Sequence, residues 1–335
     1  MSKLIVPEGY SPRLGPYETQ TAIGLIKHTF EIGLCRALNL KRASAPLFVD
    51  GGRGLNDDLN GIERPVVFDV KETGARAEVV HSLAKWKRMA LKEYGFHPGE
   101  GIYTDMNAIR RDEELDNLHS IYVDQWDWER IITPEERNLE FLKSVVQKIA
   151  DAVCDTSEVV TRIYPNIPCR LERDVSFITA QELEDLYPDL SPKERENAWL
   201  NEHRTAFIIG IGDKLKSGEK HDGRAPDYDD WALNGDLLMW NDTLGCAFEL
   251  SSMGIRVNAE SLRSQLKKAE CEWRSGLEFH KKLLAGELPL TIGGGIGQSR
   301  LCMLLLGKAH IGEVQVSVWD KETREGCEKA GIPLL

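Results

Sequence analysis

The sequence predicts an α+β fold in which helices pack around an antiparallel β-sheet. Candidate strands follow one another directly, most clearly over residues 229–257, whereas a doubly wound parallel sheet needs a helix after each strand. Candidate helices are marked by apolar residues at spacings of three and four and by N-terminal capping boxes. No repeat, low-complexity segment or linker divides the chain. We therefore expect an arm rich in Pro and Gly over residues 1–16 and a single domain over residues 17–335.

The N-terminal part of the chain predicts a long helix followed by a strand. Apolar residues recur every three or four positions over residues 17–38, as is typical of a helix with one buried face. Residues 42–49 look like a strand, but Pro46 has no N–H to donate to a central ladder. We therefore expect this strand at an edge or an interface.

The middle of the chain predicts three helices and a buried strand. A capping box and a proline at residues 133–136 are expected to open a helix that ends near Cys154. Thr179 and Ser191 are expected to cap two shorter helices. The apolar run at residues 207–212 indicates a buried strand.

The C-terminal half predicts short strands and then helix. After Asp229 we expect strands at residues 237–240, 247–251 and 254–257, followed by a helical region over residues 259–285. This run of strands is the main reason for predicting an antiparallel sheet.

Residues 121–129 alternate in character, as a strand with two different faces does. Trp126 and Trp128 fall on one face, which we expect to pack inside the protein. The other face carries Gln125, Asp127 and Glu129. These residues are too acidic for a core. Their face is therefore either exposed to solvent or lines a site with its acids and its amide.

The stretch GGGIGQSRLCMLLL, residues 293–306, is rich in glycine but matches neither common nucleotide-binding motif. It lacks the full G-x-G-x-x-G fingerprint of a dinucleotide site and the G-K-[ST] of a P-loop. We expect a strand, a glycine turn and then a buried helix. That helix would present Arg300 at its N-terminal end and be closed by Gly307.

The composition argues against several classes of protein. A net charge of -12 gives no global basic footprint for a nucleic-acid partner. No apolar run reaches the roughly 18 residues that span a bilayer, and the N-terminus lacks the apolar core of a signal peptide, so we expect a cytoplasmic location without membrane association. The seven cysteines never form C-x-x-C, which favours reduced thiols over a disulfide or zinc framework.

Two charged regions are candidate binding sites, and each also has a plain structural explanation. Residues 81–88, HSLAKWKR, form either a solvated basic helix face or a site for a carboxylate or phosphate. Residues 224–236 and 249–256 place acids on a loop and two strands. They are either ordinary surface positions or a Mg²⁺ site completed by substrate phosphates.

Several of these segments, in this order, resemble the class II aminoacyl-tRNA synthetases. An Arg-x-Asp-Glu element followed by a strand with Gln-x-Asp looks like their motif 2, and residues 293–306 look like motif 3 with Arg300 as its arginine. The segment around Pro46, after a long helix, is similar to motif 1, the dimer interface. Ser82 and Lys87 match an element of the aspartyl- and asparaginyl-tRNA synthetases.

Longer stretches resemble the ammonia-dependent asparagine synthetases, or aspartate–ammonia ligases, over essentially the whole chain. They are HSLAKWKR, YVDQWDWE, RAPDYDDW, FELSSMGIR and TIGGGIGQSRL. The resemblance implies that ATP activates the β-carboxylate of L-aspartate as β-aspartyl-AMP, releasing pyrophosphate, and that ammonia then displaces AMP. It also implies a class II synthetase-like antiparallel sheet flanked by helices, and a homodimer formed through the segment near Pro46.

The resemblance assigns the ATP-binding residues. Arg110 would hold the α-phosphate, and Arg300 would contact the phosphate tail and the adenine face. Asp236 and Glu249 would bind Mg²⁺, which with the arginines spreads the charge on the leaving pyrophosphate. Arg111 fits the synthetase pattern, whereas Arg110 fits that of the asparagine synthetases, so we expect Arg110.

The resemblance also assigns the aspartate site. Lys87 and Arg256 would grip one carboxylate, and the α-amino group must then set which carboxylate is activated. The other residues expected at the aspartate are Ser82, Gln125, Asp127, Asp229 and Ser251.

Asp57 fits the family position for a base that attracts ammonium and accepts its proton. Taken alone, the segment NDDLNG is a turn rich in Asn, Asp and Gly, and the adjacent Asp58 leaves the register open by one residue. Residue 2 is Ser, so the N-terminal cysteine nucleophile of glutamine-dependent enzymes is missing and free ammonia is the expected nitrogen donor.

Two other functions remain open at this point. One is an aspartyl- or asparaginyl-tRNA synthetase, or a relative that keeps only the adenylate step. The acidic charge and the lack of room for an anticodon-binding domain before the first helix argue against it, so we expect no tRNA partner. The other is a non-catalytic scaffold, which would have no need of the phosphate- and metal-binding residues named above.

Overall fold

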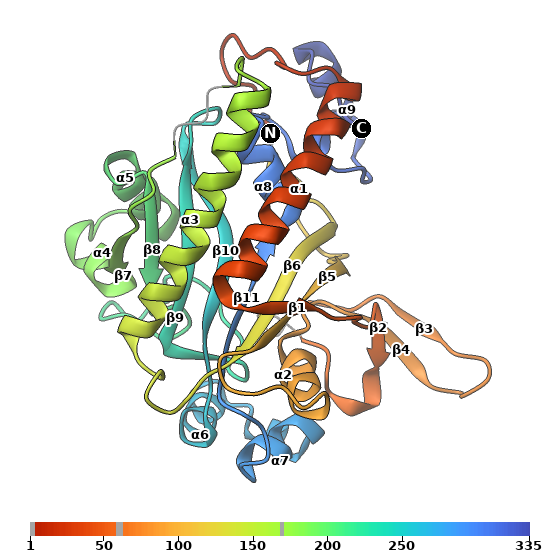
Figure 1. The fold of residues 1–335 in the computed structure, drawn as a ribbon, viewed down its shortest axis with the longest axis vertical. Helices are drawn as coiled ribbons and strands as arrows, with labels where there is room; N and C mark the ends of the chain where they lie inside the picture. The colour runs from red at the N-terminus through yellow and green to blue at the C-terminus, as the bar shows by residue number, and fades with distance from the viewer. Residues whose placement is uncertain (1–3, 58–62, 168–170) are drawn as a thin grey trace.

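A large β-sheet runs through the centre of the molecule (Figure 1). The computed structural model describes residues 4–57, 63–167 and 171–335. Within these residues the sheet has eight strands. In spatial order they are β1 (Leu40–Arg42), β5 (Gly101–Ile109), β6 (Tyr122–Ile131), β11 (Thr291–Gly297), β10 (Cys246–Arg256), β9 (Asp229–Asn241), β8 (Thr205–Ile209) and β7 (Ser176–Thr179).

The neighbouring strands of this sheet are antiparallel except at its two edges. β1 pairs with β5, and β7 with β8, in parallel. The central strands, from β5 to β8, pair antiparallel. The predicted fold, an antiparallel sheet flanked by helices, is therefore confirmed.

Three helices cover one face of the sheet (Figure 1). They are α1 (Pro16–Leu38), α3 (Leu139–Ile163) and α8 (Gln298–Leu305). Their apolar faces pack on Trp126 and Trp128 of β6, both fully buried, together with residues of β8, β9 and β10. The predicted orientation of β6 is confirmed, because its tryptophans lie in the core while Gln125 and Asp127 line a cavity.

Smaller elements surround the sheet. A three-stranded sheet, in the order β2 (Phe48–Asp50), β4 (Arg76–Val79) and β3 (Val67–Asp69), projects from the body of the protein (Figure 1). The remaining elements are η1 (Gly51–Arg53), α2 (Ala84–Glu93), α4 (Ala180–Leu186), α5 (Pro192–Glu202), α6 (Ala259–Lys268), η2 (Glu272–Gly276), α7 (Glu278–Leu284), η3 (Ile311–Glu313) and α9 (Lys321–Ala330).

The bounds predicted for helix α3 are wrong at both ends. Residues 133–136 form a turn and do not open the helix. The helix begins after Asn138, whose Oδ1 accepts the N–H of Phe141 at 2.9 Å. It continues to Ile163 rather than Cys154, because its buried apolar face extends past the predicted end. The predicted N-caps of α4 and α5, Thr179 and Ser191, are confirmed.

Other predicted elements are divided or joined differently in the structure. The strand expected over residues 42–49 is two strands in different sheets, β1 and β2, and Pro46 lies between them. The three short strands expected after Asp229 are two long ones, β9 and β10. The helical region over residues 259–285 is α6, η2 and α7. No helix of the described residues is both long and apolar enough to cross a membrane.

Candidate active site

A cavity of about 690 Å³ opens on the face of the sheet opposite α1 and α3. Its floor and walls come from β6, β9, β10 and β11, and one side is closed by the loop that joins β5 to β6, residues 110–121. A cavity of this size suits a substrate as large as a nucleotide. Ten of the twelve predicted site residues line it: Ser82, Arg110, Gln125, Asp127, Asp229, Asp236, Glu249, Ser251, Arg256 and Arg300.

The glycines of residues 293–297 lie in strand β11 and not in the predicted turn. A Cβ on Gly295 would overlap the amide of Gln125, and one on Gly293 would overlap the carboxylate of Glu129 and the guanidinium of Arg256. The glycines therefore leave room for polar side chains from β6 and β10. Arg300 does lie in the first turn of α8, as predicted, and Gly307 follows that helix with a φ of 58°.

One end of the cavity holds buried cations surrounded by acids. Arg256 Nη2 lies 2.8 Å from Glu129 Oε2, and a second nitrogen of Arg256 contacts Asp229. Lys87 contacts Asp127 and donates to the carbonyl of Trp128 at 2.7 Å. Lys87 is fully buried and is not on the cavity lining, so a substrate would contact it only when Asp127 moves away from it.

The pKa values of two acids at this end are shifted in opposite directions. Burial raises the pKa of Asp127, although Lys87 acts in the opposite direction. Burial also opposes ionisation of Glu129, but the nearby Arg256 and Lys87 outweigh it and lower the pKa of Glu129. Glu129 is therefore the stronger counter-ion of Arg256 and Lys87, whereas Asp127 separates from Lys87 more easily.

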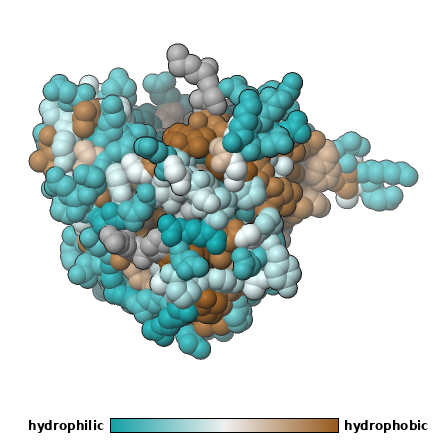
Figure 2. Space-filling model, turned by 90° about the horizontal axis from the view of Figure 1, so that it is seen from above, coloured by the Kyte–Doolittle hydropathy of each residue, from teal (hydrophilic) through white to brown (hydrophobic). Residues whose placement is uncertain are grey.

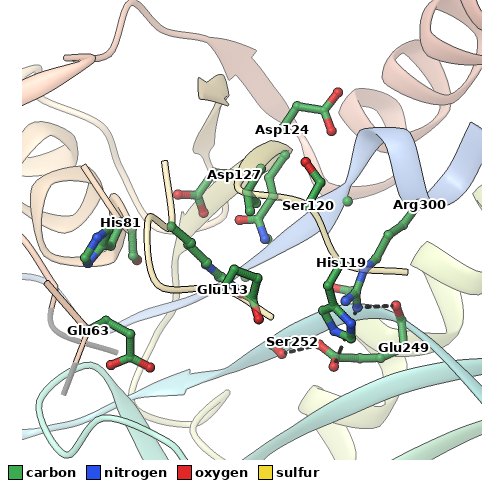
Figure 3. Close-up of a pocket in the computed structure, with 18 of the residues that line it drawn as sticks. Glu63, His81, Glu113, His119, Ser120, Asp124, Asp127, Glu249, Ser252 and Arg300 are labelled. Atoms are coloured by element: carbon green, nitrogen blue, oxygen red, sulfur yellow. Dashed lines mark hydrogen bonds and ion pairs between the residues drawn. The ribbon is translucent and has the colours of Figure 1, made fainter. Parts of the chain in front are cut away.

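The other end of the cavity holds the two predicted metal ligands. Asp236 of β9 contacts Arg224, and Glu249 of β10 accepts the hydroxyl of Ser252 at 2.9 Å. Arg300 Nη1 lies 3.7 Å from Glu249 Oε2 and donates to the backbone carbonyl of Glu249 at 2.9 Å. Figure 3 shows Arg300, Glu249 and Ser252 grouped here, far from His81 at the opposite end.

Asp236 and Glu249 have opposite pKa shifts. Burial, with the charge of Glu249 added, raises the pKa of Asp236 to about 6 in spite of Arg224. Burial also opposes ionisation of Glu249, but Arg300, Lys193 and Arg224 outweigh it and lower the pKa of Glu249 to about 2. The described residues contain no group of three or more His, Cys, Asp or Glu placed to hold a metal ion. Two adjacent carboxylates do fit Mg²⁺, which takes a few protein oxygens plus phosphate and water.

The loop of residues 110–121 places Arg110 over the cavity. Its Nη1 lies 3.8 Å from Glu113 Oε2, and its Nε is buried without a hydrogen-bond partner among the described residues. Arg111 also lines the cavity. An unsatisfied guanidinium nitrogen at Arg110 is consistent with the register that the sequence favours.

Asp57 is buried beside the cavity but is not on its lining. Its carbonyl lies 2.9 Å from Nδ1 of His81, which does line the cavity, and its N–H donates to Asn56 Oδ1 at 3.0 Å. The negative charge of Asp57 also reaches Tyr228 on the cavity wall, where with burial it raises the pKa of the phenol. Asp58, the alternative register, lies outside the described residues.

Sequence reasoning assigned no role to several residues that lie in or behind the cavity wall, among them Glu113, His119 and Arg224 on the lining and the fully buried Glu129 behind it. Glu129 was visible in the alternation of β6, and Arg224 began a segment already noted for its acids. Neither position stands out without the structure, because it is the register between strands that brings Glu129 against Arg256 and Arg224 against Asp236.

The fold is that of the class II aminoacyl-tRNA synthetases. The structure is similar to the asparaginyl-tRNA synthetase of Pyrococcus horikoshii, with a TM-score of 0.64 at 16% identity over 94% of this chain and 74% of that one. It is also similar to the asparaginyl-tRNA synthetase of Entamoeba histolytica, with a TM-score of 0.60 at 14% identity over 90% of this chain and 66% of that one.

The sequence places the chain within one family. The model of the aspartate–ammonia ligase family matches residues 17–331. The chain is 60% identical to the aspartate–ammonia ligase of Ruminiclostridium cellulolyticum over all of both chains, and 62% identical to that of Lactobacillus acidophilus over 99% of this chain and 100% of the relative. The chain belongs to the aspartate–ammonia ligase family, whose members synthesise asparagine from aspartate and ammonia using ATP. The ligase prediction is therefore confirmed over the two alternatives.

Proposed function

We propose that the reaction passes through β-aspartyl-AMP. The observation that supports this is that one end of the cavity holds Arg300 and two carboxylates and another end holds Arg256 and several acids, with Arg110 on the loop that covers the cavity. The first end suits the phosphates of ATP and the second suits an amino acid with two carboxylates. An oxygen of the β-carboxylate attacks the α-phosphorus between the two ends, and the bond from that phosphorus to pyrophosphate breaks.

At the phosphate end, Arg110 contacts the α-phosphate and Arg300 the phosphate tail and the adenine face. Both guanidiniums carry charge into a partly enclosed site, where it stabilises the negative charge that builds on the leaving pyrophosphate. Asp236 and Glu249 would hold Mg²⁺, and the bound ion would supply positive charge that neutralises phosphate charge.

At the aspartate end, the α-carboxylate binds Arg256 and Lys87. These cations are held by Asp127, Glu129 and Asp229 in the absence of substrate. When the carboxylate arrives, the α-amino group arrives with it, and Asp127, Asp229 and Gln125 become its partners. Ser82 and Ser251 complete the site as hydrogen-bonding groups. This exchange keeps the buried charges paired and points the β-carboxylate toward the phosphate end.

Ammonia then attacks the β-carbonyl carbon, and the bond from that carbon to AMP breaks. Asp57 attracts the ammonium ion and takes the first of the two protons that its nitrogen loses, which frees the lone pair for attack, and the second proton passes to solvent as AMP leaves. Its backbone is fixed by His81 and Asn56 beside the cavity wall.

The test is to measure AMP, pyrophosphate and asparagine from ATP, Mg²⁺ and L-aspartate, with and without ammonium chloride and without tRNA. We expect one asparagine for each AMP and pyrophosphate, only when ammonium is present. Pyrophosphate exchange should require aspartate but not ammonium. Release of ADP and phosphate instead would rule out the adenylate.

We also propose a homodimer formed through the segment that contains Pro46. Leu47, Phe48 and Phe68 are 54%, 47% and 39% exposed, and the last two rings lie 5.1 Å apart. Figure 2 shows hydrophobic residues gathered at the base of the projecting sheet. Contiguous exposed apolar residues are a feature of protein–protein interaction sites. Light scattering should give twice the chain mass for the unmodified protein and the chain mass for Phe48→Glu. A monomeric unmodified protein would contradict the proposal.

A further inference from the structure

The N-terminal arm, defined here as residues 4–15, is attached to the loop of residues 110–121 through Asn117. This side chain is 2% exposed. Its Oδ1 accepts the N–H of Ile5 at 2.7 Å, and its Nδ2 donates to the carbonyl of Ile5 at 2.8 Å and to the carbonyl of Ala309 at 2.7 Å. Both amide N–H groups and the amide oxygen are therefore used, so the side chain is fixed in one orientation.

Two further contacts bind the arm, the loop and η3 into one unit. The carbonyl of Asn117 accepts the N–H of Ile311, at the start of η3, at 2.8 Å. The hydroxyl of Tyr10, in the arm, donates to the carboxylate of Glu313 at 2.8 Å. Glu313 is buried and also accepts the N–H of Ala309 at 2.9 Å. The arm is thus attached at two points about five residues apart in its sequence, Ile5 and Tyr10.

The loop that the arm holds lies at the phosphate end of the cavity. Asn117 is followed by Leu118 and His119, which line the cavity, and the same loop carries Arg110. Asp116, on the other side of Asn117, accepts the N–H groups of Leu118 and His119 at 2.7 and 2.8 Å. Figure 3 shows His119 beside Arg300 and Glu249. A shift at Asn117 would therefore be transmitted to residues that face the phosphates.

We propose that Asn117 is a positioning residue through which the N-terminal arm fixes the loop for ATP binding. The inference rests on the proposed function, in which this end of the cavity takes ATP. The loop has no strand or helix of its own between β5 and β6, so without an anchor it would have to be ordered when ATP binds. Ordering a loop on binding costs affinity, and a preformed loop avoids that cost. Aspartate binds at the other end and should not depend on the anchor.

The test compares Asn117→Ala with a variant that lacks residues 1–6, which removes Ile5 without changing the loop. A variant that lacks only residues 1–3 is the control, because it keeps Ile5. We expect both test variants to raise the KM for ATP by roughly tenfold, the effect of losing one or two net hydrogen bonds. The KM for aspartate should change by less than about twofold, and the control should match the unmodified protein. The deletion should add little to Asn117→Ala, since that substitution already removes both hydrogen bonds to Ile5, and Asn117→Ala should add to the deletion only the loss of its bond to Ala309.

Direct titration of MgATP and of L-aspartate separates this inference from the proposed function. If the unmodified protein makes no AMP, the adenylate proposal fails, yet weaker MgATP binding by the variants would still support the anchor. If Asn117→Ala does not fold, the variant without residues 1–6 decides alone. An unchanged KM for ATP in that variant, or an equal loss of aspartate affinity, would overturn the inference.

Discussion

Arg224 donates to Asp236 inside the cavity, so one of the two proposed Mg²⁺ ligands already has a cationic partner. Both side chains are nearly buried, at 8% and 10% exposure. A metal ion must share this carboxylate or displace the guanidinium. We expect Asp236→Asn to raise the Mg²⁺ concentration for half-maximal pyrophosphate exchange by at least about tenfold. Asp242→Asn, paired with Arg204 away from the cavity lining, should change nothing.

The same carboxyl predicts a pH dependence of stability. Because the pKa of Asp236 in the folded protein, about 6, lies above the model-compound value of 3.8, its contribution is fully present below about pH 4. That contribution is lost as the pH rises through 6. At about 1.4 kcal/mol per pH unit the loss is about 3 kcal/mol. Asp236→Asn should therefore gain stability relative to the unmodified protein between pH 4 and 6, and no more above pH 7. The free energy of unfolding of both proteins, measured with urea at several pH values, would show this difference. If the two free energies changed in parallel with pH, the prediction would be contradicted.

Arg110 and Arg111 should differ in their contribution to adenylate formation. Arg110→Ala should lower pyrophosphate exchange by about a hundredfold or more, because an arginine on a transferring phosphoryl group supplies several kcal/mol. Arg111→Ala is the matched control and should lower it by less than about fivefold. The reverse result would move the assignment by one residue. Arg300→Ala should lose activity as Arg110→Ala does.

Asp57→Asn should separate the two half-reactions. The variant should still catalyse pyrophosphate exchange with aspartate, since the proposed role of Asp57 is confined to the step in which ammonia attacks. It should lose asparagine synthesis by about a hundredfold, the usual contribution of a general base. Asp189→Asn, an exposed position, is the control. An equal loss in both half-reactions would show that Asp57 is not the ammonia base.

Gly295→Ala should weaken aspartate binding without unfolding the protein. The added Cβ overlaps the end of the flexible Gln125 side chain, which can move away only by leaving its place over the strand. We expect the KM for aspartate to rise about tenfold and the KM for ATP to stay within about twofold. Gly24→Ala in α1, where a Cβ meets nothing within 4 Å, is the control. Unchanged aspartate kinetics would remove Gln125 from the site.

The sequence predicts an element correctly where its residue pattern is compatible with only one structure. The alternation in β6 puts Trp126 in the core and Asp127 at the cavity because a strand has only two faces. The pattern at residues 133–136 is compatible with two structures, because the same residue types occur in isolated turns and at the starts of helices. Only the packing of α3 selects Asn138 as its first cap.

The sequence predicts which residues belong to the site better than it predicts the contacts between them. The family resemblance selects Lys87, but it does not show that Asp127 and Trp128 surround its ammonium group. It selects Asp236 and misses Arg224, twelve residues earlier in the sequence. These contacts depend on the relative positions of strands and loops, which local residue patterns do not encode.

The bare backbone of β11 also bears on engineering the enzyme. Gly295 lines the cavity and has no side chain that could be shortened, so substitution there, where a Cβ meets Gln125, can only make the cavity smaller. Libraries intended to admit a longer dicarboxylic acid should leave this strand alone. They should vary Ser82, a half-buried residue of the lining that can be changed in either direction.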